Sequence, residues 1–199
     1  MKKLFLFFLT ILFSLSQNAH TQNQNIQKLD SIYGKELIEN DFLKYAETSK
    51  IDSLKKDLKD SFNIYDEANF KIAHIDAEEL AEFTFSFFLP RLNKMLAKRS
   101  LYLIVETTSD YEKTNNILIN GEKINLYTKQ ELDNLTFWDT APRNFFKKVN
   151  QILKTKNSEE QFYLLYGGND LHVLLLTEKQ FLLITEYYKD NEKNKPYTP

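Results

Sequence analysis

The side chains best suited to chemistry lie at residues 74–79, where the sequence HIDAEE places one imidazole beside three carboxylates. A histidine at the end of a strand and carboxylates at the start of a helix can share a divalent metal ion. The same residues also predict a helix start, because Asp76 is a favourable N-cap and Glu79 follows three residues later, as in a capping box. We favour capping, because a metal site needs more converging ligands than this junction supplies. We therefore expect no metal and no cofactor.

His172 is the second candidate for acid–base chemistry. On a strand, Asp170 and His172 share a face, so the carboxylate could orient the imidazole. The alternative is a hydrogen-bonded or partly wet histidine at a sheet end, which we favour because the sequence indicates no nucleophile. The chain also lacks the G-x-S-x-G elbow, the H-E-x-x-H zinc motif and the glycine-rich phosphate loops. The motifs thus favour a protein that is not an enzyme.

Aromatic residues suggest a binding surface. Trp138 and Arg143 share a predicted loop and helix start, which is a typical recognition pair, although Trp138 can equally fill the core, and we favour the core. Tyrosines in the C-terminal apolar runs could border an exposed apolar surface, because the ring packs while the hydroxyl stays wet. Aromatic residues on strands more often belong to the core. The candidate binding residues are Trp138, Arg143, Tyr163, Tyr166, His172 and Tyr187.

Residues 160–188 organise the predicted fold. Three apolar runs, rich in aromatic and branched residues, lie at 162–166, 171–176 and 181–184. Short polar breaks separate them. Each run is too short for a helix that must bury itself, so we predict a three-stranded antiparallel meander. All three runs are apolar on both faces, which is typical of a central sheet. We expect helices on one face and further protein or a partner on the other.

Turn chemistry sets the expected registers. A two-residue loop at 168–169 would place Leu164 opposite Val173 and Tyr166 opposite Leu171.

Asn120-Gly121 is the strongest hairpin signal in the chain and predicts a type I′ turn. It would place Ile117 opposite Ile124 on one face, and Leu118 opposite Lys123 on the other. One wet face suggests that this hairpin lies towards a sheet edge.

Helical spacing and caps predict the remaining elements. Two short strands are expected at 69–75 and 101–107. The expected helices are one or two over 25–48, interrupted or bent at Gly34; one capped by Ser49; one over 77–98, kinked or restarted at Pro90; a short one in a capping box of Thr128 and Glu131; and one over 141–156 with Pro142 in its first turn.

The amino terminus resembles an export signal in its pattern. MKK precedes the apolar stretch 4–15, which is too short to span a bilayer, and Ser14 and Ser16 would allow cleavage before Gln17. The alternative is an uncleaved anchor or a buried helix, which fits the flanking residues less well. We expect an exported protein, periplasmic or secreted, with no stable membrane span after cleavage.

Composition narrows the function further. The chain has no cysteine, so it forms no disulfide and must rely on a packed core. A formal net charge of −2, without a basic stripe, argues against nucleic-acid binding. Lysine far outnumbers arginine, and asparagine is common, a bias typical of AT-rich bacterial genomes.

The predicted organisation is a signal peptide at 1–16, a helical segment at 17–64, an α+β core at 65–188 and a polar tail at 189–199. The predicted fold class is α+β, with a mostly antiparallel sheet packed with helices. The leading functional hypothesis is a non-enzymatic module that binds a protein or an apolar ligand. The alternatives are a small envelope hydrolase using carboxylates and a histidine, and an assembly factor whose N-terminal helices dock on a partner. Oligomeric state is not predicted.

Overall fold

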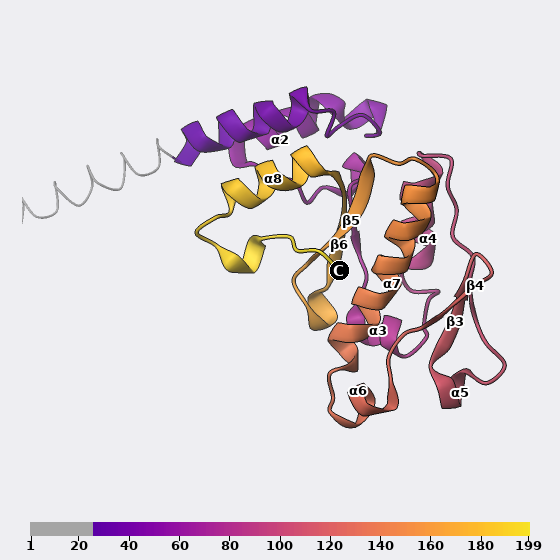
Figure 1. The fold of residues 1–199 in the computed structure, drawn as a ribbon. Coiled ribbons are helices and arrows are strands. Elements are labelled where there is room, and N and C mark those ends of the chain that lie inside the picture. Colours follow the sequence, from indigo (N-terminus) through magenta and orange to yellow (C-terminus); the bar gives the residue numbers. More distant parts are fainter. Residues whose placement is uncertain (1–25) are drawn as a thin grey trace, which may run out of the picture.

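Two small antiparallel sheets, each of three strands, are packed with helices in this α+β protein, as the sequence predicts (Figure 1). The computed structural model describes residues 26–199, so the predicted signal peptide and the polar segment after it lie outside the described residues. The strands are β1 (Ile72–His74), β2 (Val105–Thr107), β3 (Asn116–Ile119), β4 (Glu122–Asn125), β5 (Glu160–Leu165) and β6 (His172–Thr177). The helices are a first helix at 26–39, which we call the N-terminal helix, then α2 (Ile51–Ser61), α3 (Ala77–Ala81), α4 (Leu89–Ala97), α5 (Tyr111–Thr114), α6 (Lys129–Asp133), α7 (Phe137–Thr155) and α8 (Glu178–Tyr187). Within 26–199, no helix is both long enough and apolar enough to cross a membrane.

The first sheet has the strand order β1-β6-β5, with both neighbouring pairs antiparallel. Leu164 pairs with Val173, so the predicted register is confirmed. The connection is not a two-residue turn, however. Tyr166 adopts a left-handed φ of 63°, and residues Gly168–Asp170 form a 3-10 turn (η3) before β6 begins.

The prediction that 181–184 is a third strand is wrong, because this run belongs to α8. Thr177 and Gln180 form a capping box, in which each side chain accepts a hydrogen bond from the other's backbone N–H (3.3 and 3.2 Å). This cap starts a helix directly after β6, and the apolar run then buries Ile184 on the inner side of that helix. The third strand is instead β1, from much earlier in the chain.

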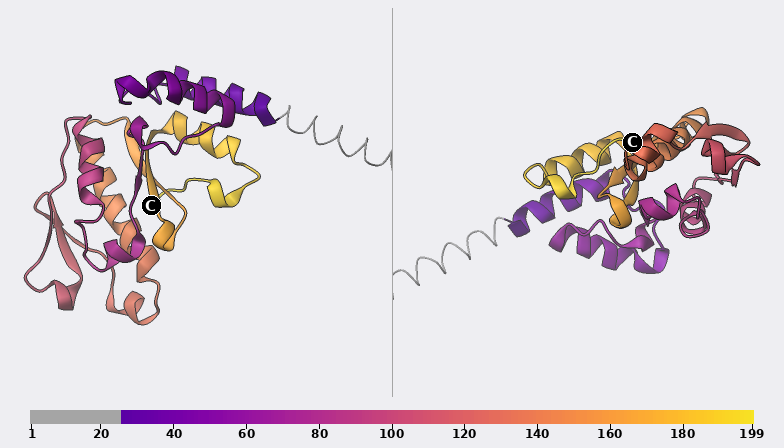
Figure 2. Two further views of the ribbon diagram at one scale, coloured as in Figure 1. Left: turned by 180° about the vertical axis from the view of Figure 1, so that it is seen from behind. Right: turned by 90° about the horizontal axis from the view of Figure 1, so that it is seen from below.

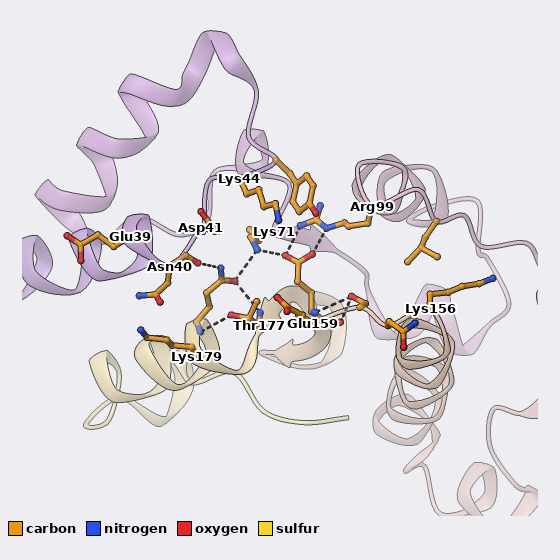
Figure 3. Close-up of a pocket in the computed structure, with 16 residues that line it drawn as sticks. Glu39, Asn40, Asp41, Lys44, Lys71, Arg99, Lys156, Glu159, Thr177 and Lys179 are labelled. Atoms are coloured by element: carbon orange, nitrogen blue, oxygen red, sulfur yellow. Dashed lines mark hydrogen bonds and ion pairs between the residues drawn. The ribbon is translucent and has the colours of Figure 1, made fainter.

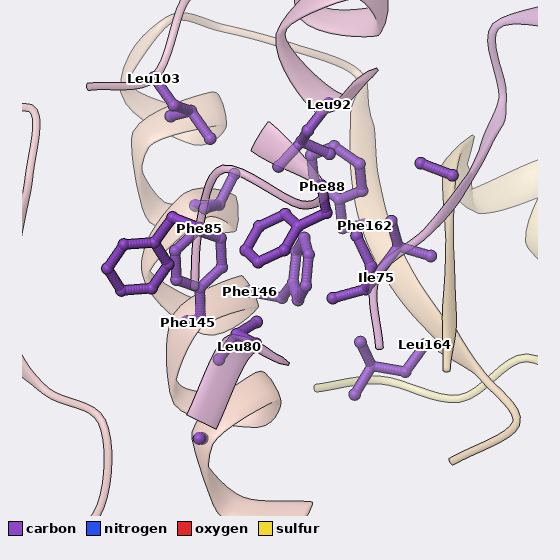
Figure 4. Packing of buried hydrophobic residues seen from close by; sticks show 14 of the residues in the cluster. Ile75, Leu80, Phe85, Phe88, Leu92, Leu103, Phe145, Phe146, Phe162 and Leu164 are labelled. Atoms are coloured by element: carbon purple, nitrogen blue, oxygen red, sulfur yellow. The ribbon is translucent and has the colours of Figure 1, made fainter. Parts of the chain in front are cut away.

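Both faces of the first sheet are buried, as the apolar runs predict. Alternate residues point to two separate cores, because side chains on a strand alternate between faces. One core contains the strand residues Ala73, Phe162, Leu164, Val173 and Leu175 and packs against α3, α4 and α7 (Figure 4). The other contains Ile72, Tyr163, Leu165, Leu174 and Leu176 and packs against the N-terminal helix, α2 and α8. Figures 1 and 2 show these last three helices gathered at one end of the molecule. The chain's own helices therefore cover the face for which a partner was considered.

The second sheet has the order β2-β3-β4 and contains the predicted hairpin. Asn120 and Gly121 have φ angles of 51° and 82°, as a type I′ turn requires. Ile117 pairs with Ile124, and β4 is largely exposed, so the predicted register and the wet face are both confirmed. The strand expected at 101–107 is shorter, since only Val105–Thr107 form a strand, β2.

The N-terminal helix continues through Gly34 without the predicted interruption. An ideal Cβ at this position would lie 2.1 Å from the backbone oxygen of Leu58 in α2, so glycine allows the two helices to approach closely. Ser49 does not cap α2 as predicted. It lies in a 3-10 turn (η1, Thr48–Lys50), and the N-cap position is Lys50, which makes no side-chain cap bond.

The predicted helix at 77–98 divides into α3 and α4, with Pro90 in the first turn of α4. Asp76 caps α3 by accepting hydrogen bonds from the N–H groups of Glu78 and Glu79 (3.0 and 3.3 Å), as expected. The Thr128–Glu131 capping box is also confirmed. The helix expected from 141 starts earlier, at Phe137.

Two further expectations about α7 are therefore wrong. Pro142 lies inside the helix rather than in its first turn, and Trp138 lies in the first turn rather than in a loop. The earlier start follows from Thr136, whose carbonyl accepts hydrogen bonds from the N–H groups of Asp139 and Thr140 (both 3.1 Å).

The segment 189–199 packs against the sheet, although its sequence has no core pattern. It contains a 3-10 turn (η4, Glu192–Asn194) and then an isolated β-bridge to the outer edge of β5. Leu164 and Tyr197 exchange both backbone hydrogen bonds (2.8 Å each). The side chain of Asn150 in α7 satisfies the backbone of Phe162 in the same way, with bonds of 2.7 and 2.9 Å. The exposed edge of β5 is thus largely covered.

Candidate functional site

Of the three tyrosines predicted to border a binding surface, Tyr163 is buried, and Tyr166 and Tyr187 are partly buried. Tyr163 is only 1% exposed, and its ring stacks on that of Phe181 at 4.0 Å, so it belongs to the second core. Tyr166 and Tyr187 lie in a cluster whose hydroxyls bond to groups within the chain. The Tyr166 hydroxyl is 3.3 Å from that of Tyr65, and the Tyr187 hydroxyl donates to the Asp30 carboxylate (2.6 Å). The hydroxyls of Tyr166 and Tyr187 therefore connect separate segments of the chain.

Burial and, to a smaller extent, the neighbouring Tyr65 hydroxyl together raise the pKa of Tyr166 to about 12. Burial likewise raises the pKa of Tyr187, and the hydrogen bond to Asp30 acts in the same direction. Both hydroxyls are therefore neutral at physiological pH. The Tyr187 hydroxyl joins α8 to the N-terminal helix, and the Tyr166 hydroxyl joins the end of β5 to Tyr65 in the segment after α2.

The two histidines considered separately in the sequence are brought together by the sheet. His74 and His172 are direct partners across β1 and β6, with ring centroids 4.8 Å apart. Each imidazole bonds to a backbone carbonyl, that of Asn169 for His74 (2.7 Å) and that of Asp170 for His172 (2.8 Å). Within the described part of the chain, no group of three histidine or acidic residues could hold a metal ion. The backbone carbonyls of the η3 turn therefore orient both imidazole rings.

Trp138 and Arg143 both belong to the N-terminal half of α7, and each lies near Tyr197 of the C-terminal segment. Trp138 is 39% exposed and packs on Phe137, which takes the buried position that the core interpretation gave to the tryptophan. Arg143 donates to Asp139 (2.7 Å), and its guanidinium lies 4.9 Å from the ring centroid of Tyr197. A hollow of about 370 Å³ separates Trp138 from the η3 loop. This arginine is thus engaged within the chain.

A polar cleft of about 760 Å³ lies where β6 passes into α8, and it contains a buried group of charges (Figure 3). Glu160 is the centre of the group. Its carboxylate accepts two hydrogen bonds from Arg99 (2.6 and 3.0 Å) and a third from the ammonium of Lys71. Lys71 also donates to the side-chain oxygen of Gln180 (3.0 Å), whose amide nitrogen donates to the carbonyl of Asn40 (2.7 Å). We call Lys71, Arg99 and Glu160 the ion triad.

Burial sets the electrostatics of the triad. Lys71 is 1% exposed, and removal from water lowers the pKa of its ammonium to about 8, although the Glu160 charge opposes this shift. Burial acts to raise the pKa of Glu160, but the hydrogen bonds and charges of Arg99 and Lys71 hold it below its ordinary value. An amine of this kind is suited to proton transfer or to nucleophilic attack on a carbonyl group.

The contacts of the triad favour a structural role over catalysis. Its carboxylate bonds to both cations, and the ammonium of Lys71 bonds to the carboxylate and to an amide oxygen. The guanidinium of Arg99 is held further by the carbonyl of Met95 (3.0 Å) and lies 4.0 Å from the ring centroid of Tyr45. These bonds join β5, α4 and the start of β1. Sequence reasoning did not identify these three residues.

An apolar groove of about 570 Å³ lies between the N-terminal helix and α8, on the outer side of both helices. We call it the α8 groove. Three of its large apolar side chains are substantially exposed, with exposed fractions of 49% for Leu29, 43% for Ile32 and 57% for Leu182. The groove is lined by Leu29, Ile32, Tyr33, Glu36, Lys179, Leu182, Leu183 and Glu186. Exposed apolar groups gathered on one surface are typical of a site for association.

Comparison with known proteins gives no relative: the chain matches no protein-family model, no curated protein and no solved structure. The function of the chain is therefore inferred from the geometry of its own surfaces.

Proposed function

We propose that this protein is a non-catalytic interaction module that binds a protein partner through the α8 groove. The observation that carries the proposal is the exposure of Leu29, Ile32 and Leu182 on two adjacent helices. Side chains of this size are ordinarily buried when they cluster, and burial of each contributes about 1.5–3 kcal/mol. These three side chains are already about half buried, so a partner that covers the groove would supply the remaining part of that burial.

The remaining polar groups support an interaction role over the hydrolase alternative. The two imidazoles of the described chain bond to backbone carbonyls, and the carboxylate of Glu160 bonds to Arg99 and Lys71. A general base must instead be within hydrogen-bond reach of the proton that it abstracts from a substrate. The proposal also places the module outside the cytoplasm, because residues 1–16 have the pattern of an export signal.

A photo-crosslinking residue in place of Leu182 tests the proposed surface in the producing cell. We expect ultraviolet light to join the chain to a protein, giving a discrete product of higher mass. The matched control is the same residue in place of Leu135, which is 66% exposed but lies away from the groove. Equal products from both positions, or none from position 182, would contradict the proposal. Mass spectrometry of the envelope fraction separately tests removal of residues 1–16.

A further inference from the structure

The outer face of α8 has a symmetric arrangement of charge and apolar surface. Lys179, Leu182, Leu183 and Glu186 all line the groove, and their spacing of three, four and seven residues places them in one row along the helix. The cation lies at one end of the row, the carboxylate at the other, and the two leucines lie between them. Reversing the direction of such a row exchanges the cation with the carboxylate.

We propose that the α8 groove binds a second copy of this chain, with α8 antiparallel to α8 of the partner copy. This inference rests on the proposed function and specifies its partner. A two-fold axis near Leu182 and Leu183 would place these leucines against those of the partner. The same axis would place Lys179 beside the partner's Glu186, and Glu186 beside the partner's Lys179. One surface thus meets itself with opposite charges at both ends, as an isologous interface requires.

The N-terminal helix extends this surface beside α8. It runs antiparallel to α8, because Asp30 contacts Tyr187 while Asn40 contacts Gln180. Leu29 and Ile32, which flank Asp30, therefore lie beside the end of the α8 row that carries Glu186, and pairing two copies would bring four helices together. Antiparallel helices packed in this way bury a shared apolar core, as in a four-helix bundle.

The local partner of Glu186 does not oppose this pairing. Glu186 contacts Lys189 at 3.1 Å, but both side chains are more than half exposed. Exposed ion pairs of this kind contribute little to stability, so Glu186 can exchange this contact for one across the interface. A lipid surface or an apolar ligand would bury the leucines equally well, but neither would use the matched charges at the two ends.

Exchanging the charges tests the arrangement directly. The measurement is analytical sedimentation of the chain purified from the producing cell, in the form to which the cell processes it. Lys179→Glu alone places carboxylates together at both ends of the interface, and Glu186→Lys alone places ammonium groups together there. Each should weaken dimerisation at least about tenfold, because like charges then face each other twice. Mixing the two variants restores opposite charges at both ends, so a dimer with one copy of each should form with about the wild-type affinity.

Two further variants separate this pairing from other outcomes. Leu182→Ser should also weaken the dimer, whereas Leu135→Ser, away from the groove, should not; circular dichroism checks that both remain folded. A wild-type chain that is monomeric at about 0.1 mM would overturn the inference. A mixture of the charge variants that stays monomeric would overturn it as well.

The crosslink at position 182 distinguishes failure of this inference from failure of the proposed function. A product of twice the chain mass supports the dimer. A product with a different protein overturns the dimer and leaves the proposed function standing, whereas no product contradicts both. Flotation with phosphatidylethanolamine and phosphatidylglycerol vesicles that Leu182→Ser abolishes, in a monomeric chain, would assign the groove to lipid and overturn the dimer.

Discussion

The ammonium of Lys71 and the carboxylate of Glu160 meet across the width of the first sheet. Lys71 lies directly before β1 and Glu160 opens β5, while the central strand β6 separates the two outer strands. Arg99 holds the same carboxylate from its other side with two hydrogen bonds. The contact therefore ties both edges of the sheet to α4, and its removal should be visible in stability.

Glu160→Gln should destabilise the protein strongly, because it leaves two buried cations without a carboxylate. The expected loss in the free energy of unfolding is about 3–5 kcal/mol, as for other buried pairs that lose one partner. Lys71→Met is the matched variant and should cost less, since Arg99 still neutralises Glu160. Urea denaturation of both variants measures the difference. Equal losses would show that Lys71 and Arg99 do not share the carboxylate.

The stability contributed by Lys71 should depend on pH in a defined direction. The pKa of its ammonium is about 8 in the folded protein, against an ordinary value of 10.5. Between these values the unfolded chain binds a proton that the folded chain lacks, so the free energy of unfolding rises with pH. Below pH 8 both states are protonated and this dependence disappears.

The pH dependence is measured as the stability of the wild type minus that of Lys71→Met, from urea denaturation at pH 7, 8, 9 and 10. This difference removes the contribution of the tyrosines, which both proteins share. It should increase from pH 8 to pH 10, by at most about 1.4 kcal/mol per pH unit. A constant difference would show that Lys71 keeps its proton throughout the range.

Gly34→Ala should destabilise the contact between the N-terminal helix and α2. The added Cβ would lie 2.1 Å from the oxygen and 2.5 Å from the carbon of the Leu58 carbonyl, which is backbone and cannot rotate away. We expect a loss of about 1–3 kcal/mol from overpacking, which outweighs the better helix propensity of alanine. Thermal and urea denaturation measure it.

Gly167→Ala provides the control for this substitution. Gly167 is extended, with a φ of −164°, and an added Cβ would meet nothing within 4 Å. Its stability should therefore equal that of the wild type within experimental error. Equal behaviour of the two variants would mean that the helices separate easily.

Tyr163→Ser should destabilise the protein by about 3–5 kcal/mol, as for other large side chains removed from a core. Its ring is buried and stacked on Phe181, so the loss leaves a cavity in the second core. Tyr163→Phe keeps the ring and removes only the hydrogen bond from Gln161 (2.5 Å), so it should lose about 1 kcal/mol. A mild effect of the serine variant would place Tyr163 on a binding surface instead.

Local turn and cap chemistry explains which elements were predictable. Asn120 and Gly121 both adopt a positive φ, and the alternation on either side fits the same register, so the hairpin was predicted completely. The length and composition of the run at 181–184 predict a strand, because so short an apolar run lacks a decisive period. The Thr177–Gln180 capping box was the competing signal. The true third strand, β1, could not be found locally, because it lies far from β6 in sequence.

The candidate sites were less predictable because their residues meet only through the fold. Lys71 lies 89 positions from Glu160, and no sequence pattern connects them. Leu29 had the spacing of a buried stripe, yet it is half exposed while Leu37 on the same helix is fully buried. The row on α8 could not be recognised in the sequence, because its residues share a face only in a helix and part of this segment is predicted to be a strand. Which side of a helix is covered depends on its neighbours, and the sequence of that helix does not contain them.

The contact between Tyr187 and Asp30 joins residues 157 positions apart, and that between Gln180 and Asn40 spans 140. Contacts between residues so far apart in sequence form slowly. During synthesis, the N-terminal residues of these contacts have no partner until the C-terminal part of the chain is made. The α8 groove therefore exists only after the two ends of the fold have met. An incomplete or partly unfolded chain presents the two helices separately, without the groove between them. Association through the groove would accordingly select finished molecules over those still folding.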